Sequence, residues 1–194
     1  MIIKNISAII KSSETMCAVV DNGGTMWIGD MHSLYPLWGL PVMDNDQLYT
    51  LLDIDDKKAE KLTAASFFEV NLEDVDGDEV QIERYPLNLS GHMVYHTSRG
   101  AAFVEARYMR PLYDLKGEVT YWQRVNRHGM LYIAVKVGLL LRAILLPNEY
   151  QCNPVMLDGL QRLTRDVECA IEYQKLREAV GGEQMEMEAV ADES

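Results

Sequence analysis

The apolar residues of this chain fall into many short runs, and turn-forming residues separate most of them. Asn22-Gly23 and Asp76-Gly77 stand between apolar segments, and such pairs favour tight hairpin turns because they accept a positive φ. The β-branched segments 2–11 and 15–20 predict the first two strands. The pattern indicates an α+β fold that is built mainly from antiparallel sheets.

The most apolar part of the chain begins at Leu131 and extends to residue 180. This part and the residues just before it predict three consecutive antiparallel strands, over 118–125, 130–136 and 139–147. Asn153 and Pro154 then suit the N-cap and the first position of a helix. The residues that follow form one apolar stripe at helical spacing: Met156, Leu160, Leu163, Val167 and Ala170. We therefore predict a long helix over 154–180, which ends at Gly181-Gly182.

Shorter elements are predicted between these two parts of the chain. Asp44 and Gln47 have the spacing of a capping box and predict a short helix near 45–63. The segments 67–73 and 79–85 flank Asp76-Gly77 and predict a further hairpin. Segment 101–112 suits a strand by its alternation and a helix by its Ala and Glu content, so both interpretations stay open.

Two segments of the chain repeat the same order of features. Residues 26–41 and 131–147 each contain an apolar run, a break at Gly or Asp, a second apolar run and a final Pro, and each precedes a helical pattern. The echo predicts an internal duplication with halves at about 1–96 and 101–182, as an alternative to one undivided α+β domain over 1–182. Residues 183–194 contain five carboxylates and neither Lys nor Arg, so we expect a disordered acidic tail.

Charge and composition limit the classes of function. The net charge is −12, and the tail contributes five of these charges, which leaves −7 on the rest of the chain. Such an excess disfavours nonspecific binding to nucleic acid and to anionic lipid. No apolar window reaches the ~18 residues that a membrane span needs, and the three cysteines lack disulfide or zinc spacing. We expect a cytoplasmic protein that does not bind membranes.

The sequence contains no motif of a catalytic, cofactor or metal site. The acidic segment 74–79 resembles a calcium loop, but Gly77 stands at its fourth position, where an EF-hand needs glycine at the sixth. His92 and His96 are predicted on a strand, where residues four apart lie ~13 Å from each other, too far to share one ion. We therefore predict no catalytic residue, no metal and no cofactor, and we favour a non-enzymatic protein.

Two sets of residues are candidates for binding surfaces. Aromatic residues are typical of interaction hot spots, and the candidate interaction patch consists of Trp27, Tyr35, Trp38, Tyr108, Tyr113 and Trp122. The candidate DNA-facing residues are the cations of the two predicted helical regions, Lys57, Lys58, Lys61, Arg162 and Arg165. Acidic residues are interspersed with both groups of cations, as on a solvated helix surface.

Several runs of the sequence carry a resemblance to a known group. The runs WIGD, LYPLWGLP and LLDI, and further along RPL, YIAVKVG and AILLP, resemble proteins encoded in phage and prophage regions of Firmicutes, which implies a phage-related context. We predict an interaction or assembly protein with a protein partner or self-association. Two alternatives stay open. One is a DNA-associated factor, since strand-rich halves with one helix each resemble sliding DNA clamps in organisation, and the other is an enzyme without a recognisable motif.

Overall fold

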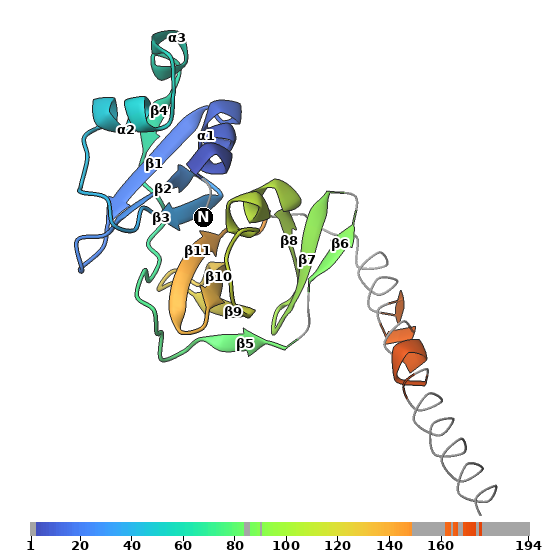
Figure 1. The fold of residues 1–194 in the computed structure, drawn as a ribbon. Helices are drawn as coiled ribbons and strands as arrows, with labels where there is room; N and C mark the ends of the chain where they lie inside the picture. Colours follow the sequence, from blue (N-terminus) through green and yellow to red (C-terminus); the bar gives the residue numbers. More distant parts are fainter. Residues whose placement is uncertain are drawn as a thin grey trace, which may run out of the picture. The chain divides into compact units, whose positions relative to one another are not determined.

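The computed structural model describes residues 3–83, 86–89 and 91–148, together with 162–163, 165–166, 169–173 and 175. The chain divides into two compact units, Met1–Glu149 and Tyr150–Ser194. The first unit contains a large sheet, a small sheet and all the helices that pack on them (Figure 1).

The chain begins with a helix, so the strand that we predicted over residues 2–11 is wrong. The elements of this part are α1 (Ile3–Ser12), β1 (Thr15–Val20), β2 (Met26–Asp30) and β3 (Ser33–Pro36). In α1 the buried residues are Ile6, Ser7, Ile9 and Ile10, which is the spacing of one helical face. The many isoleucines suggested a strand, but the period of the apolar positions decides between helix and strand.

The three strands predicted near the end of the first unit are present. They are β9 (Val119–Val125), β10 (Leu131–Val137) and β11 (Leu140–Leu145), and they pair antiparallel in sequence order. The ambiguous segment 101–112 contains both predicted elements in succession, β8 (Gly100–Glu105) and the 3₁₀ helix η1 (Ala106–Leu112). Pro111 lies inside η1.

The large sheet has eight strands in the order β4-β1-β2-β3-β11-β10-β9-β5. It is a mixed sheet, which contradicts the mainly antiparallel prediction, because β4 (Thr63–Ala65) pairs parallel to β1. The long connection through α2 (Asn45–Leu51) and α3 (Asp56–Ala59) returns the chain to the outer side of β1 and so allows the parallel pairing. The predicted capping box of α2 is confirmed, with Asp44 and Gln47 bonding reciprocally.

The predicted hairpin around Asp76-Gly77 is wrong. Only its second arm is a strand, β5 (Val80–Ile82), and this strand pairs with β9, whereas residues 66–79 have neither strand nor helix. A separate antiparallel sheet consists of β6 (Leu87–Leu89), β7 (His92–Thr97) and β8.

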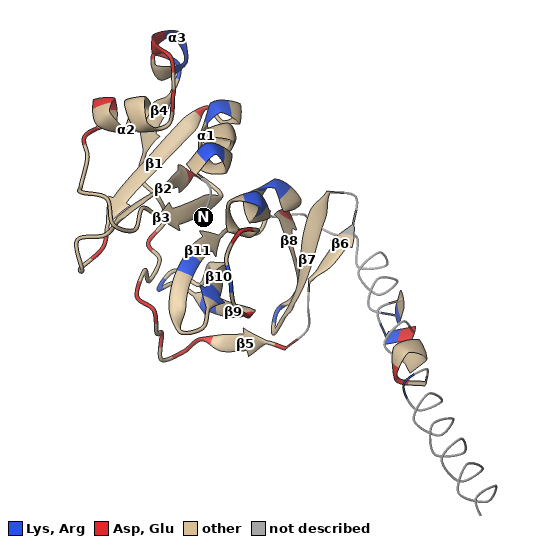
Figure 2. Ribbon diagram, viewed as in Figure 1, with Lys and Arg blue, Asp and Glu red and all other residues tan. Residues whose placement is uncertain are grey.

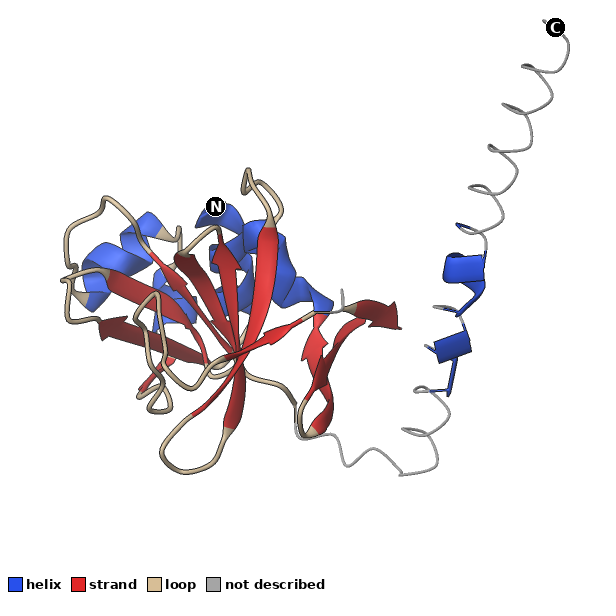
Figure 3. Cartoon of the chain, turned by 90° about the horizontal axis from the view of Figure 1, so that it is seen from below, coloured by secondary structure: helices blue, strands red, loops and turns tan. Residues whose placement is uncertain are grey.

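Each face of the large sheet has its own apolar core. On one face, α1, α2, η1 and the small sheet pack against residues such as Ile28, Tyr35 and Ile133, and the helices gather on one side of the strands (Figure 3). On the opposite face, Phe67 of the irregular segment packs against Trp27 and other buried residues of the sheet. The segment 66–72 therefore covers the apolar core on one face of the sheet, as the helices cover the core on the other face.

The long helix predicted over 154–180 is also wrong, because the helix that the structure supports is short. Its described residues lie between Arg162 and Lys175, and all of them are exposed. The remainder of the predicted range and the acidic tail 183–194 lie outside the described residues. No helix in the described part of the chain is long and apolar enough to cross a membrane.

The two segments that echo each other in sequence meet in the middle of the large sheet. Residues 26–36 form the β2–β3 hairpin, residues 131–145 form the β10–β11 hairpin, and β3 pairs antiparallel with β11. The helical pattern predicted after the first segment is present as α2. A helix also precedes each set of three strands, α1 before β1–β3 and η1 before β9–β11, and these two helices contact each other.

Candidate functional site

The acidic segment 74–79 is held against the sheet by two buried cations. The Arg124 guanidinium, whose side chain is fully buried, pairs with the Glu79 carboxylate at 2.6 Å, and Lys136 Nζ pairs with the same carboxylate at 2.5 Å. Arg124 also donates to the backbone carbonyls of Asn71, Glu73 and Asp74. These contacts give the segment a structural role.

The histidines and cysteines do not form a metal site in the described part of the chain. No group of three metal-ligating residues occurs among the described residues. His92 and His96 lie on β7, as predicted. Burial and the nearby Asp30 carboxylate raise the pKa of the Cys17 thiol to about 11, so this cysteine is protonated at neutral pH. Cys169 is exposed, and Cys152 lies outside the described residues.

The structure separates the candidate aromatic patch into buried and exposed residues. Trp27, Tyr35 and Tyr108 are almost completely buried and belong to the two cores. Trp122 is partly buried, with Lys136 Nζ 4.6 Å from its ring centroid. Trp38 and Tyr113 are exposed to 44% and 66%, so these two are the residues of the set that offer aromatic surface to a partner.

The candidate DNA-facing lysines lie on or just after α3 and are surrounded by carboxylates. Lys58 Nζ donates to the Ser13 carbonyl at 2.6 Å, while Lys57 and Lys61 are exposed. Asp55, Asp56 and Glu60 are interspersed with them. Arg162 and Arg165 lie in the other compact unit, and both are exposed.

A different set of cations gathers on α1 and η1 (Figure 2). Asn5 Nδ2 donates to the Arg110 carbonyl at 2.9 Å, and Arg107 Nη1 donates to Ser12 Oγ at 3.0 Å. The start of α1 therefore contacts the end of η1, and the end of α1 contacts the start of η1. The two helices lie side by side and run in opposite directions. We call this surface the helix-pair face and define it by Lys4, Lys11, Arg107, Arg110 and Tyr113.

Helical spacing places these side chains on the outer surface of each helix. In α1, Lys4, Ala8 and Lys11 are exposed, and positions i, i+4 and i+7 share one side of an α-helix. In η1 and its C-cap the outward residues are Arg107, Arg110 and Tyr113, which are three apart and align along a 3₁₀ helix. Neither helix contains an Asp or a Glu.

Two of the four cations have carboxylate partners. Lys11 Nζ lies 3.3 Å from Asp53, and Arg107 Nε lies 2.8 Å from Glu105. Within the described residues, no ion pair involves Lys4 or Arg110. Counting the two partners, the helix-pair face has a net charge of +2 on a chain whose total is −12.

Exposed aromatic surface adjoins this face. A cavity of about 270 Å³ is lined by Ile3 of α1, Leu115 beyond η1, Trp38 and Arg142, with others. The Arg142 guanidinium lies 5.4 Å from the centroid of the Trp38 ring, which is the distance of a cation–π contact. Trp38 and Ile3, the first residue of α1, thus line the same cavity.

The buried Asp30 carboxylate fixes η1 to the β2–β3 turn. Its Oδ2 accepts from the Tyr108 hydroxyl at 3.1 Å, and its Oδ1 accepts from Ser33 Oγ at 3.0 Å and from the His32 backbone N–H at 2.9 Å. Arg107 Nη2 donates to the same Tyr108 hydroxyl at 2.9 Å. Burial and the Asp30 charge raise the pKa of Tyr108, so its hydroxyl stays protonated and keeps this bond.

The helix-pair face was missed in the sequence because its residues come from segments about a hundred positions apart. The segment 2–11 was interpreted as a strand, and 101–112 had no single assignment. The spacing of Lys4 and Lys11 against the buried isoleucines was the available signal.

Comparisons with known proteins give this chain no relatives. No family model matches it, no curated protein matches it, and no solved structure matches it. The phage-related context therefore stays a prediction.

Proposed function

We propose that this chain is a non-enzymatic binding protein that holds single-stranded nucleic acid on the helix-pair face. One observation carries the proposal. Two helices from distant parts of an acidic chain lie side by side and present four cations and no carboxylate of their own. Phosphate groups are the natural partner of such a surface, because neutralising them releases condensed counterions.

The exposed aromatic residues favour a single strand over a duplex. Tyr113 follows Arg107 and Arg110 on the same side of η1, and Trp38 lies beside the start of α1. Bases of a single strand can stack on such rings, whereas a duplex keeps its bases stacked on each other. Arg107, Arg110 and Tyr113 lie close together in the sequence, and the packing of α1 against η1 adds Lys4 and Lys11 to them.

The size of the face sets the expected strength of binding. With 10 residues, α1 is ~15 Å long, so the face reaches only a few phosphates. Four phosphate contacts to a single strand correspond to a slope of about −3 in a plot of log affinity against log salt. We therefore expect moderate affinity at low salt that falls steeply as salt rises.

Charge reversal of the two unpaired cations tests the proposal. The double variant Lys4→Glu with Arg110→Glu is expected to bind a fluorescently labelled single-stranded oligonucleotide at least about tenfold more weakly at low salt and to show a shallower salt slope. Both side chains are exposed, so circular dichroism should show an unchanged fold. Fluorescence anisotropy at several salt concentrations measures both quantities.

The matched control reverses two other exposed lysines. The variant Lys57→Glu with Lys61→Glu changes the net charge of the chain by the same amount but acts beyond the helix-pair face. It is expected to retain most of the affinity. Equal losses in the two double variants would show a general charge effect and would refute the assignment of the face.

The sliding-clamp-like alternative makes a different prediction in the same experiment. A clamp surrounds duplex DNA, so it requires salt-sensitive binding to a duplex that equals or exceeds binding to a single strand. The packing of α1 against η1 is the observation that favours this alternative, because clamps also use paired helices. Tighter binding to the single strand would exclude it.

Self-association is a second candidate function. In the unit Tyr150–Ser194, Leu163, Ile171 and Tyr173 are exposed to 57%, 48% and 71%, and large apolar residues exposed on a helix are typical of an interface. Light scattering after size exclusion at low micromolar concentration is expected to show a dimer or larger species. Replacing all three residues by Ser should give a monomer, and a wild-type chain that is already monomeric would remove this candidate.

A further inference from the structure

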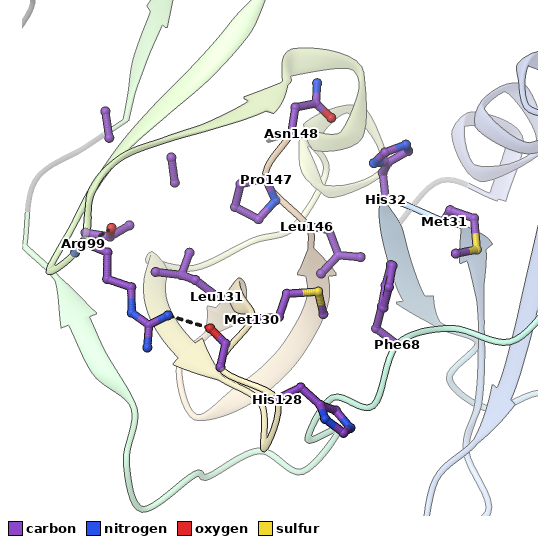
Figure 4. A pocket seen from close by; sticks show the side chains of 14 residues that line it. Met31, His32, Phe68, Arg99, His128, Met130, Leu131, Leu146, Pro147 and Asn148 are labelled. Atoms are coloured by element: carbon purple, nitrogen blue, oxygen red, sulfur yellow. Dashed lines mark hydrogen bonds between the residues drawn. The ribbon is translucent and has the colours of Figure 1, made fainter. Parts of the chain in front are cut away.

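We infer that a groove in the unit Met1–Glu149 binds an amphipathic organic anion, a molecule with one carboxylate or phosphate head on an apolar body. The groove has a volume of about 860 Å³, which is within the range of small-molecule sites. None of its lining residues belongs to the helix-pair face, and its walls come from the β2–β3, β7–β8 and β9–β10 turns, residue 68 and residues 146–148 (Figure 4).

The groove is lined by one arginine and two histidines, and no carboxylate occurs among its described lining residues. Its ionisable residues are Arg99, His32 and His128, although acidic residues outnumber Lys and Arg by 30 to 18 in the chain. The carboxylate of Glu69 lies 3.6 Å from His128 Nε2, but it already pairs with Arg127 outside the lining. Among the described lining residues, a ligand in the groove therefore meets the Arg99 guanidinium and two imidazole rings, and no carboxylate.

Arg99 is held in place before any ligand arrives. Its Nη1 donates to the Gly129 carbonyl at 2.5 Å, and its backbone N–H donates to Thr97 Oγ1 at 3.2 Å. The neighbouring Ser98 is held by the buried side chain of Gln123. Gln123 Oε1 accepts from the Ser98 backbone N–H at 2.6 Å, and Gln123 Nε2 donates to the Ser98 hydroxyl at 2.7 Å. A guanidinium has five N–H donors, so those that Gly129 does not engage can bind an anionic head in a fixed position, which lowers the entropy cost of binding.

The turn that supplies Gly129 is fixed in the same way. Asn126 Oδ1 accepts from the backbone N–H groups of His128 and Met130, at 3.0 and 2.9 Å. On the opposite wall, the His32 backbone is held by Asp30 Oδ1 on one side and by the Leu146 N–H on the other. The polar groups of the groove are therefore mounted on rigid turns.

The rest of the groove is apolar and suits a hydrocarbon or aromatic body. Phe68 is 45% exposed, yet its ring is held edge-on against buried Phe67, with centroids 6.2 Å apart. Met31, Met130, Leu131, Leu146 and Pro147 complete the apolar lining. Methionine adapts its shape to different ligands, and covering this surface is favourable because it removes apolar area from water.

The arrangement of these residues gives the ligand an orientation. Figure 4 shows Arg99 at one side of the groove, and Phe68, Met31 and His32 at the opposite side, with Leu131, Met130 and Leu146 between them. The head of the ligand pairs with Arg99, and its body lies across Leu131 and Met130 toward Phe68. A bare inorganic ion would use only the first of these contacts.

Calorimetric titration of the full chain tests the inference with matched probes. Octanoate and octyl phosphate are expected to bind, and octyltrimethylammonium, which has the same chain and a positive head, is expected to bind at least about tenfold more weakly. Inorganic phosphate should give no measurable binding under the same conditions. Equal binding of the anionic and cationic octyl compounds, or no binding of octanoate and octyl phosphate, would overturn the inference.

Two variants locate the site. Arg99→Gln is expected to weaken octanoate binding about tenfold, since one charge-assisted contact is lost, and Phe68→Glu is expected to abolish it by placing a negative charge on the apolar wall. The control variant Lys4→Glu with Arg110→Glu should bind octanoate as the wild type does. An Arg99→Gln chain that is folded and binds octanoate unchanged contradicts the site, whatever the outcome of the nucleic-acid experiment.

Discussion

Replacing Glu79 by alanine is expected to lower the free energy of unfolding by about 3 kcal/mol or more. The carboxylate is 8% exposed and balances two buried cations, Arg124 and Lys136, whose side chains are 0% and 4% exposed. Its removal leaves both charges inside the protein without an ionic partner, and the carbonyl groups that Arg124 also contacts offset only part of that cost. Urea denaturation of the wild type and the variant measures the difference.

The control for this prediction is another ion pair of the same chemical type. Glu69 pairs with Arg127 at the surface, where the side chains are 55% and 70% exposed, and such pairs contribute less than about 1 kcal/mol. Glu69→Ala should therefore change the stability little. A Glu79→Ala variant as stable as Glu69→Ala would show that the buried cluster does not hold segment 71–79 against the sheet.

Replacing Gly29 by alanine is expected to destabilise the fold by more than about 3 kcal/mol, or to prevent folding. A Cβ at this position would lie 1.7 Å from the Ser33 carbonyl oxygen and 2.7 Å from its carbon. Both atoms are backbone atoms of the adjacent strand, so no side-chain rotation can relieve the contact. β2 and β3 would have to separate in the middle of the large sheet, where β3 also pairs with β11.

Gly77→Ala is the matched control, because a Cβ there would have nothing within 4 Å. This variant should stay within about 0.5 kcal/mol of the wild type. Thermal unfolding monitored by circular dichroism compares the two variants. A Gly29→Ala chain that unfolds at the wild-type temperature would mean that the two strands can move apart without cost.

The sequence was most informative where one local signal decides the structure. The Asn22-Gly23 turn joins β1 to β2, and the capping box at Asp44 begins α2, because both signals involve residues within a few positions of each other. The three strands from 119 to 145 were equally accessible, since their apolar runs are bounded by clear turns. These elements account for much of the large sheet.

The parts that could not be predicted depend on distant contacts. In the parallel pairing of β4 with β1, Thr63 lies opposite Thr15. A strand of three residues is too short for its sequence pattern to indicate which strand it pairs with. The hairpin expected around Asp76-Gly77 failed because Arg124 and Lys136 attract the acidic segment to the sheet and leave its first arm without a strand to pair with. Both proposed binding surfaces likewise combine turns or helices that are far apart in the sequence of the first unit.

Asp30 gives the two proposed sites a common foundation. Its Oδ2 accepts a hydrogen bond from the Tyr108 hydroxyl, and that hydroxyl accepts one from Arg107 of the helix-pair face. Its Oδ1 accepts a hydrogen bond from the backbone N–H of His32, which lines the groove. Whereas Arg99 and Arg110 can each be changed to disable one site, a change at Asp30 would disturb both sites and the core together. Asp30 should therefore tolerate substitution less well than any cation of either surface. A phenotype caused by a change at Asp30 would not show which of the two proposed functions was lost.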